Sequence, residues 1–204
     1  MAIKNKNILI TAGPTWVPID SVRVISNIAT GETGTLLAKK LSAAGAKVTL
    51  LLGPVGVCCL NKKIRLIRFK FFDELRKKVI RELSSKKYDV IIHNAAVSDF
   101  KPSRFKGKIS SGKPQALKLK PLPKIIRDIR RLSRKSKVVI FKFEPGVCDS
   151  VLIKKARRAR LEAGADFIVA NRISPYRAII IDKEGVLAIA KTKMDLVNKL
   201  ITKI

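Results

Sequence analysis

Short apolar runs alternate with longer amphipathic segments along most of the chain. The predicted strands are residues 7–11, 47–52, 88–93, 138–141 and 166–170. The predicted helices are residues 36–44, 72–83, a segment that starts at Pro123, and residues 150–163 and 194–204. Alternation of this kind is typical of parallel strands joined by crossover helices. It predicts an α/β, Rossmann-like three-layer fold with a mostly parallel sheet.

The last two apolar runs are too close together for a crossover. Residues 178–182 and 186–190 are separated by the turn sequence of residues 183–185, which ends in Gly185. This spacing predicts a C-terminal β-hairpin. No internal repeat and no domain boundary is visible, so we expect residues 1–204 to form a single domain.

The regular pattern stops between residues 98 and 123. This stretch is rich in Lys, Ser, Gly and Pro and is too long for an ordinary connection. We therefore expect a flexible basic flap at about residues 100–122. Its cations Lys101, Lys106, Lys108 and Lys113 are suited to closing over a bound anion. The alternative interpretation, for each of these lysines taken alone, is that it is a solvated charge on a loop.

The first strand leads into a loop punctuated by Gly13, Gly31 and Gly34, and then into a helix. Backbone N–H groups and the positive end of a helix dipole attract phosphate. In a doubly wound sheet, ligands lie beyond the carboxyl ends of the strands. Asn27 and Asn94 are the polar side chains best placed there to orient a substrate. A helix cap for Asn27 and a turn for Asn94 are the structural alternatives.

The chain carries 44 Lys and Arg against 15 Asp and Glu, a net charge of +29. Such a charge creates a field that attracts anions. Nucleic acid is one candidate partner, but aromatic residues make up only 5% and no recognition motif is present. Nucleic-acid binding is therefore disfavoured as the function, and small phosphorylated molecules are preferred.

Several other classes of protein are disfavoured because the residues or motifs that they require are absent from the sequence. The only histidine, His93, ends an apolar strand and is expected in the core rather than acting as a base. Cys58, Cys59 and Cys148 show no metal-ligand or redox spacing, which favours free thiols in a reducing cytoplasm. No Walker A motif, signal peptide or apolar run of roughly 20 residues is found, so no membrane attachment is expected.

A short-chain reductase that binds NAD(P) is a second hypothesis, because residues 30–34 and 94–96 are similar to that class. Its chemistry needs a tyrosine four residues before a lysine. Tyr88 and Tyr176 are followed at that offset by Ile92 and Ile180. The second strand also lacks a following acidic residue to hold a nicotinamide ribose. Hydride transfer is therefore disfavoured.

The loop motifs together resemble one family, the phosphopantothenate–cysteine ligases of coenzyme A biosynthesis. In the first half the shared motifs are residues 12–15, 18–20, 22–23, 25–27, 30–31, 43–49 and 53–54. Later they are residues 95–100, 107–109, Pro123 with Ile125, and residues 141–144 and 165–171. The order and spacing make the resemblance specific over nearly the whole chain, which looks like a stand-alone ligase.

The resemblance implies an enzyme that joins 4'-phosphopantothenate to L-cysteine with CTP or ATP and Mg²⁺, through an acyl-nucleotide intermediate. It implies catalytic roles for Asn27, Lys108 and Arg23, and a homodimer. In such a dimer we expect the hairpin 178–190 to pair or pack across the two-fold axis. The substrate-binding residues that it implies are Asn27, Thr30, Gly31 and Ala96. The nucleotide-binding residues that it implies are Gly13, His93, Asn94, Ala95, Asp99, Lys108, Pro123, Lys124, Ile125, Phe141, Lys155 and Arg160.

The chain departs from the family pattern at several places. Lys108 is followed by Ile-Ser-Ser rather than by further lysines. Trp16 and Val17 stand where an Arg-Glu pair is common. On the late helix, Arg160 replaces one of two lysines that contact the nucleotide, and the second position falls near Ala163. Residues 141–144 resemble ATP-using eukaryotic ligases as much as CTP-using bacterial ones, and the rest of the first half favours CTP.

Overall fold

A central eight-stranded sheet forms the core of the computed structural model, which describes residues 3–56, 60–103, 105 and 107–204. The predictions for Cys58, Cys59 and Lys106 fall outside these residues. Six strands are parallel and lie in the order β5 (Arg65–Arg68), β4 (Lys47–Leu52), β1 (Asn7–Ala12), β6 (Val90–His93), β9 (Lys137–Phe143) and β10 (Phe167–Arg172). The antiparallel strands β11 (Arg177–Ile181) and β12 (Val186–Ala190) complete the sheet. The predicted mostly parallel sheet and C-terminal hairpin are confirmed.

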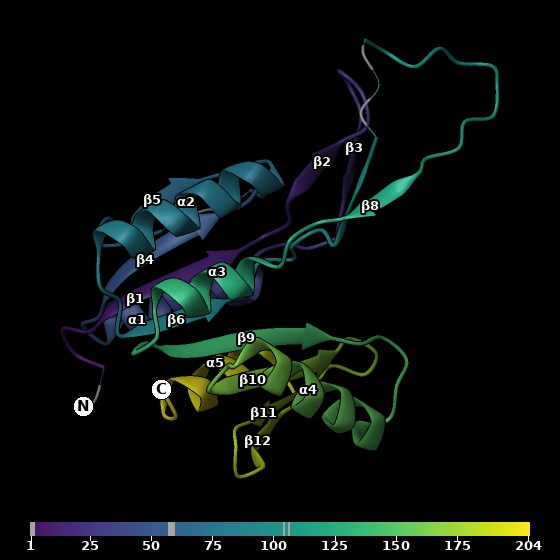
Figure 1. The fold of residues 1–204 in the computed structure, drawn as a ribbon. Helices are drawn as coiled ribbons and strands as arrows, with labels where there is room; N and C mark the ends of the chain where they lie inside the picture. Colours follow the sequence, from purple (N-terminus) through teal and green to yellow (C-terminus); the bar gives the residue numbers. More distant parts are fainter. Residues whose placement is uncertain (1–2, 57–59, 104, 106) are drawn as a thin grey trace.

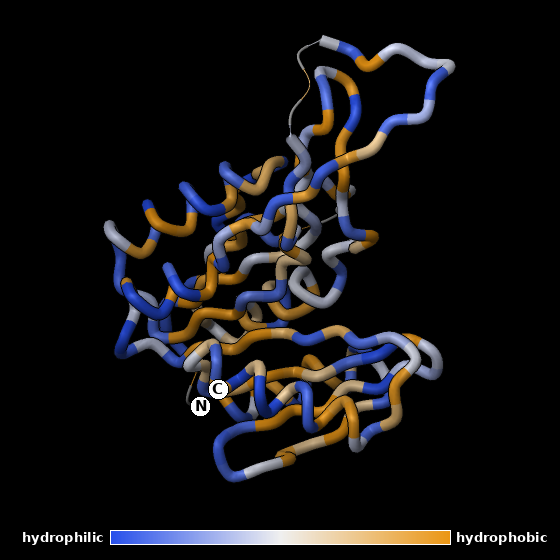
Figure 2. The backbone as a smooth tube through the Cα atoms, turned by 45° about the vertical axis from the view of Figure 1, so that its right-hand side comes forward, coloured by the Kyte–Doolittle hydropathy of each residue, from blue (hydrophilic) through white to orange (hydrophobic). Residues whose placement is uncertain are grey.

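Helices cover both faces of this sheet, as the three-layer prediction requires (Figure 1). The helices α1 (Glu32–Ala43) and α5 (Lys193–Ile201) pack on one face; α2 (Phe72–Ser85), α3 (Ile125–Leu132) and α4 (Asp149–Ala163) pack on the other. Side chains alternate along the strands, so Ile8 and Ile10 contact the first layer and Leu9 contacts the second. Figure 2 shows the hydrophobic strands at the centre and hydrophilic segments along the outer helices.

A two-ribbon arm projects from the carboxyl ends of the strands (Figure 1). The strands β2 (Trp16–Pro18) and β3 (Val24–Ser26) form one antiparallel ribbon, and β7 (Phe100–Pro102) and β8 (Leu119–Pro121) form the other. The sequence pattern missed all four strands because each is only three residues long. The predicted flap, residues 100–122, therefore begins and ends in β-structure.

Two further elements differ from prediction. The pattern also missed β5, whose four residues begin and end with arginine and form an edge of the sheet. The helix α1 begins at Glu32, four residues before the predicted start, and Gly31 at φ +70° precedes it. The hydroxyl of Thr35 donates to the Gly31 carbonyl at 2.9 Å, so polar contacts rather than apolar periodicity form its first turn.

The first turn of α1 lies directly against the end of β1. A Cβ added at Gly34 would lie 2.4 Å from the Ala12 Cβ, and 3.2 Å from Nδ2 of Asn94. Only a residue without a side chain allows the helix to approach this closely. Gly34 therefore sets the distance between the α1 N-terminus and the β1 and β6 ends.

Replacing Gly34 with alanine should destabilise the fold. In an exposed helix the same change is stabilising, because alanine has the higher helix propensity. Here the added methyl group overpacks the contact with Ala12, and we expect the free energy of unfolding to fall by about 1–3 kcal/mol. Urea unfolding of Gly34→Ala measures it. The control Gly56→Ala meets no atom within 4 Å and should unfold like the unmodified protein.

Candidate active site

The switch point of the sheet lies between β1 and β6, because the chain builds β4 and β5 on one side of β1 and β6 on the other. At this point β1 and β6 are joined by side-chain contacts as well as by the backbone hydrogen bonds of their parallel pairing. The Thr11 Oγ1 lies 2.8 Å from His93 Nδ1 and accepts the Ala95 N–H at 3.2 Å. Ligands bind at such switch points in open α/β sheets.

The segments that follow β1 and β6 run side by side beyond the sheet. The Ala96 N–H donates to the Gly13 carbonyl at 2.9 Å, and the Thr15 N–H donates to the Ala96 carbonyl at 3.3 Å. The buried Thr15 hydroxyl accepts the Ser98 N–H at 2.9 Å. These bonds hold residues 13–15 and 95–98 as one rigid floor.

Asn27 is placed over this floor. Its Nδ2 donates to the carbonyls of Ala96 and Val97 at 3.1 and 3.2 Å, while the residue as a whole is exposed. Both donors of the amide are thereby oriented, and no donor within the described residues reaches Oδ1. The predicted substrate residues Asn27 and Ala96 therefore do lie together, with Asn27 fixed by main-chain contacts rather than by a helix cap.

The N-terminus of α1 faces the same place. Gly31 precedes the helix, Asn94 lies beside Gly34, and the Thr30 hydroxyl lies 3.4 Å from the Glu32 nitrogen. The start of this twelve-residue helix therefore presents N–H groups next to the β6 end. Such an arrangement attracts a carboxylate or phosphate.

His93 contributes no charge to this site at neutral pH. Burial lowers its pKa to about 4, and its Nδ1 contacts Thr11. A neutral imidazole can exchange hydrogen bonds but cannot act as a cation toward phosphate. His93 is half-buried at the end of β6, so it lies at the margin of the core rather than inside it, where a core histidine would lie.

A second group of predicted residues lies at the start of α3. The Lys124 Nζ contacts the Asp99 carboxylate at 2.6 Å, and both side chains are more than half exposed. Ile125 is buried in the core, so only its backbone is available to a ligand. Asp99 and Lys124 therefore form an exposed pair beyond the end of β6.

Cations also gather where β9 ends. Glu144 lies between Lys155 at 2.6 Å and Lys142 at 3.0 Å, and these two ammonium groups hold its pKa below the usual value. Phe141 is half-buried in β9. Arg160 does not join this group: it lies in the last turn of α4, where it donates to the Ala165 carbonyl at 3.1 Å. The helix carries it toward the opposite edge of the sheet.

Arg23 and the flap are held together by a buried carboxylate. Asp20 accepts the N–H groups of Val22 and Arg23 at 2.8 Å each and that of Ile109 at 3.0 Å, and it pairs with the Arg23 guanidinium at 2.5 Å. Burial by itself raises the pKa of Asp20, but the Ile109, Val22 and Arg23 donors outweigh it and hold that pKa far below its usual range. Arg23 also donates to the Ile109 carbonyl.

The flap consequently belongs to the arm in this structure and does not cover the switch point. Ser21 donates to the Gly107 carbonyl at 3.0 Å, and Phe105 donates to the Ile19 carbonyl at 3.0 Å. The segment 107–118 extends from the far end of the arm (Figure 1). Lys108 is exposed there and, like Arg23, is not gathered with Asn27.

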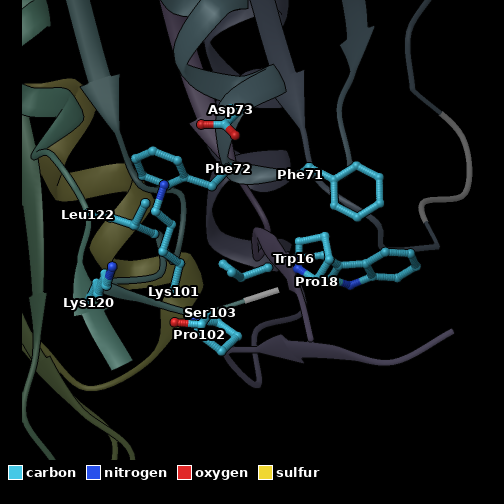
Figure 3. Close-up of a pocket in the computed structure, with 11 residues that line it drawn as sticks. Trp16, Pro18, Phe71, Phe72, Asp73, Lys101, Pro102, Ser103, Lys120 and Leu122 are labelled. Atoms are coloured by element: carbon cyan, nitrogen blue, oxygen red, sulfur yellow. The ribbon is translucent and has the colours of Figure 1, made fainter. Parts of the chain in front are cut away.

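The base of the arm encloses an apolar pocket of about 330 Å³ that the sequence did not predict. Trp16 and Phe71 pack edge to face with centroids 6.2 Å apart, and Lys101 and Lys120 line the other side (Figure 3). The backbone N–H of Trp16 also donates to the Lys70 carbonyl at 2.8 Å. Aromatic residues far apart in the sequence therefore attach the arm to α2.

Asp20→Asn should loosen the arm. An amide cannot accept all the donors that the carboxylate holds, so Trp16, the only tryptophan, should become more accessible to acrylamide. In the unmodified chain the lowered pKa of Asp20 keeps this contribution intact above about pH 4, and it is lost as the pH falls through the folded-state pKa. Quenching measured from pH 7 downwards tests both effects.

The control is Asp182→Asn, which removes another carboxylate that accepts two turn N–H groups, those of Glu184 and Gly185. It lies in the β11–β12 turn and should leave Trp16 quenching unchanged. Equal quenching in Asp20→Asn and the unmodified chain would contradict the assigned role of Asp20.

The switch-point floor, the oriented amide and the start of α1 define a class: a Rossmann-like α/β domain whose switch point presents N–H groups suited to an anion. The chain belongs to the family described as the DNA/pantothenate metabolism flavoprotein C-terminal domain, whose model matches residues 3–203. Among solved structures, the DNA/pantothenate metabolism flavoprotein from Streptococcus pneumoniae is similar, with a TM-score of 0.89, 26% identity and coverage of 97% of both chains.

Two curated relatives share one name, coenzyme A biosynthesis bifunctional protein CoaBC. The one from Thermococcus kodakarensis is 36% identical over 86% of this chain, and the one from Borreliella burgdorferi is 33% identical over 99% of it. The matches cover 43% and 53% of those relatives, so the chain spans about half their length. Within the described residues, no helix is both long enough and apolar enough to cross a membrane.

Proposed function

We propose that this chain is a cytoplasmic ligase that joins 4'-phosphopantothenate to L-cysteine in coenzyme A biosynthesis. Family membership and the coenzyme A role in the names of the relatives support this proposal. The observation that carries it is the position of Asn27, whose amide is fixed over the switch point beside the start of α1.

The reaction has two steps in which the bonds balance. A carboxylate oxygen of phosphopantothenate attacks the α-phosphorus of a nucleoside triphosphate, and diphosphate leaves. The cysteine amine then attacks the acyl carbon, the amide bond forms, the amine loses a proton, and nucleoside monophosphate leaves with the electron pair of the broken C–O bond. Bringing a carboxylate to a triphosphate requires donors and cations that offset their repulsion.

We assign the predicted residues to the pantothenate or to the nucleotide according to where they lie. In this proposal Asn27 Oδ1, Thr30, Gly31 and Ala96 bind the pantothenate end, and Arg23 acts from the arm, where Asp20 holds it. Gly13, His93, Asn94 and Ala95 border the nucleotide, as do Asp99, Pro123, Lys124, Phe141 and Lys155. Lys108 supplies its charge to the phosphates when the flap moves toward them.

Mg²⁺ enters this proposal with the triphosphate. Among the described residues, no group of three or more His, Cys, Asp or Glu side chains could hold a metal ion. Asp99, Glu144 and Asp20 are each paired with cations. The protein's own part is therefore to bind and orient the phosphates, and we favour CTP over ATP as the triphosphate.

The defining experiment mixes the protein with 4'-phosphopantothenate, L-cysteine, Mg²⁺ and either CTP or ATP, and measures diphosphate and product. We expect both with CTP. Asn27→Asp should lower product formation by at least about a hundredfold or let the acyl-nucleotide accumulate, because a carboxylate cannot donate to Ala96 and repels the reacting carboxylate.

Asn198→Asp is the matched control, since Asn198 is an exposed amide on α5. It should turn over at the unmodified rate. Normal turnover by Asn27→Asp, with its folding verified by urea unfolding, would contradict the assigned mechanism.

We also propose that the active form is a homodimer. Exposed apolar side chains follow the arm: Val22, Val24, Ile28, Phe100, Phe105 and Leu119. Ile28 is completely exposed, which is unusual for a surface that meets only water. The arm is thus the surface that favours contact with a second copy, and the edge strand β12 in the hairpin is the alternative.

Sedimentation velocity separates these two surfaces. Val24→Ser combined with Leu119→Ser should convert the dimer into a monomer, because apolar contact area is lost at the interface. The control Ile189→Ser changes an exposed side chain of β12 and should remain dimeric. A monomer produced only by Ile189→Ser would assign the interface to the hairpin instead.

A further inference from the structure

A large basic hollow lies at the edge of the sheet opposite the candidate active site. It is open to solvent, has a volume of about 860 Å³, and is built where β1, β4 and β5 begin and where the chain enters β6. Parallel strands place their amino ends on one edge and their carboxyl ends on the other. This basic hollow is therefore separate from the residues that surround Asn27.

Five cationic side chains from three parts of the chain line the hollow. They are Lys47, Lys63, Arg65, Lys86 and Lys87. Within the described residues, Glu82 is the acidic side chain that forms an ion pair with these cations. It is buried and is held by Arg65 at 2.6 and 3.0 Å and by the Tyr88 hydroxyl at 2.7 Å. Asp89 accepts the backbone N–H of Asn7 beside the hollow. A clear excess of positive charge remains.

Three of these cations are free to meet a ligand. Lys47, Lys63 and Lys87 are exposed, and none of them forms an ion pair within the described residues. Helix dipoles explain only part of this accumulation, since the C-terminus of a helix favours cations within its own last turn. Lys47 and Lys63 lie on or before strands and are not part of a helix.

A buried polar side chain also borders the hollow. Ser42 in α1 lines it and is more than nine-tenths buried, yet its hydroxyl has no hydrogen-bond partner in the described part of the chain. A buried hydroxyl without a partner is costly. The hydroxyl oxygen itself is covered, so this cost falls on the fold, and the case for a ligand rests on the cations.

The shape and surface of the hollow decide which polyanion it suits. None of the large exposed apolar side chains of the described chain lines it, since Val48 and Tyr88 are buried. A lipid surface is flat and is held partly by inserted apolar groups, whereas a phosphodiester chain is a ridge of charge that enters a recess. No recognition motif and few aromatic residues are present, so bases would not be read.

We propose that the basic hollow binds the phosphodiester backbone of a nucleic acid without sequence preference, independently of the ligase site. The five cations of this site contribute to the net charge of +29, which exceeds what two small acidic substrates require. Contacts of this kind depend strongly on salt, because each neutralised phosphate releases condensed counterions.

The test uses the full chain and a fluorescein-labelled single-stranded RNA of mixed sequence, with binding followed by anisotropy. The hollow variant combines Lys47→Glu, Lys63→Glu and Lys87→Glu. Removing three phosphate contacts should make the slope of log Kobs against log [KCl] shallower by about 2, equivalent to roughly twentyfold between about 50 and about 200 mM salt. Ligase turnover should remain unchanged in this variant.

The charge-matched control combines Lys77→Glu, Lys183→Glu and Lys191→Glu, which are exposed on other surfaces. It should keep the slope of the unmodified chain. Equal losses in the two variants would assign binding to net charge alone, and absence of RNA binding at about 50 mM KCl would overturn the proposal. Binding of phosphatidylserine vesicles through the same lysines, with no RNA binding, would assign the hollow to membranes. Retained turnover in the hollow variant shows that it is folded.

Discussion

The close approach of α1 to the ends of β1 and β6 is the constraint on which the site depends. Gly34 permits it, since any side chain at that position would overlap Ala12. The helix start, the Thr11–His93 contact and the floor of residues 13–15 and 95–98 then occupy fixed positions relative to one another. Asn27 is oriented by that floor, so packing in the core determines where the reacting groups of a ligand would meet.

The layers of the fold could be predicted from the sequence because buried parallel strands are continuously apolar and amphipathic helices repeat regularly. Ile8, Leu9 and Ile10 illustrate this, since they contact alternate helix layers and all three are apolar. The arm could not be predicted in this way. Its strands are three residues long, and they are held by contacts such as Asp20 with Ile109, which are distant in sequence. Local patterns carry no information about such pairs.

The sequence predicted which loops form the site, but not how their side chains are arranged in space. The rule that ligands lie beyond strand carboxyl ends grouped Gly13 with Asn94, and the segments that carry them do run side by side. It could not show that Arg23 pairs with Asp20, or that α4 carries Arg160 away from Lys155. The second positive surface was also missed, because lysines spread over several segments converge only after the sheet has formed.

The half-buried, neutral His93 has a consequence for how the site responds to acidity. It is the only histidine, and histidine is the side chain whose ordinary pKa lies between about 5 and 8. With its pKa at about 4, the protonation of the cleft stays constant across that interval. A change in ligand affinity near pH 6 would therefore report the second ionisation of a phosphate monoester on the ligand, which falls at about pH 6.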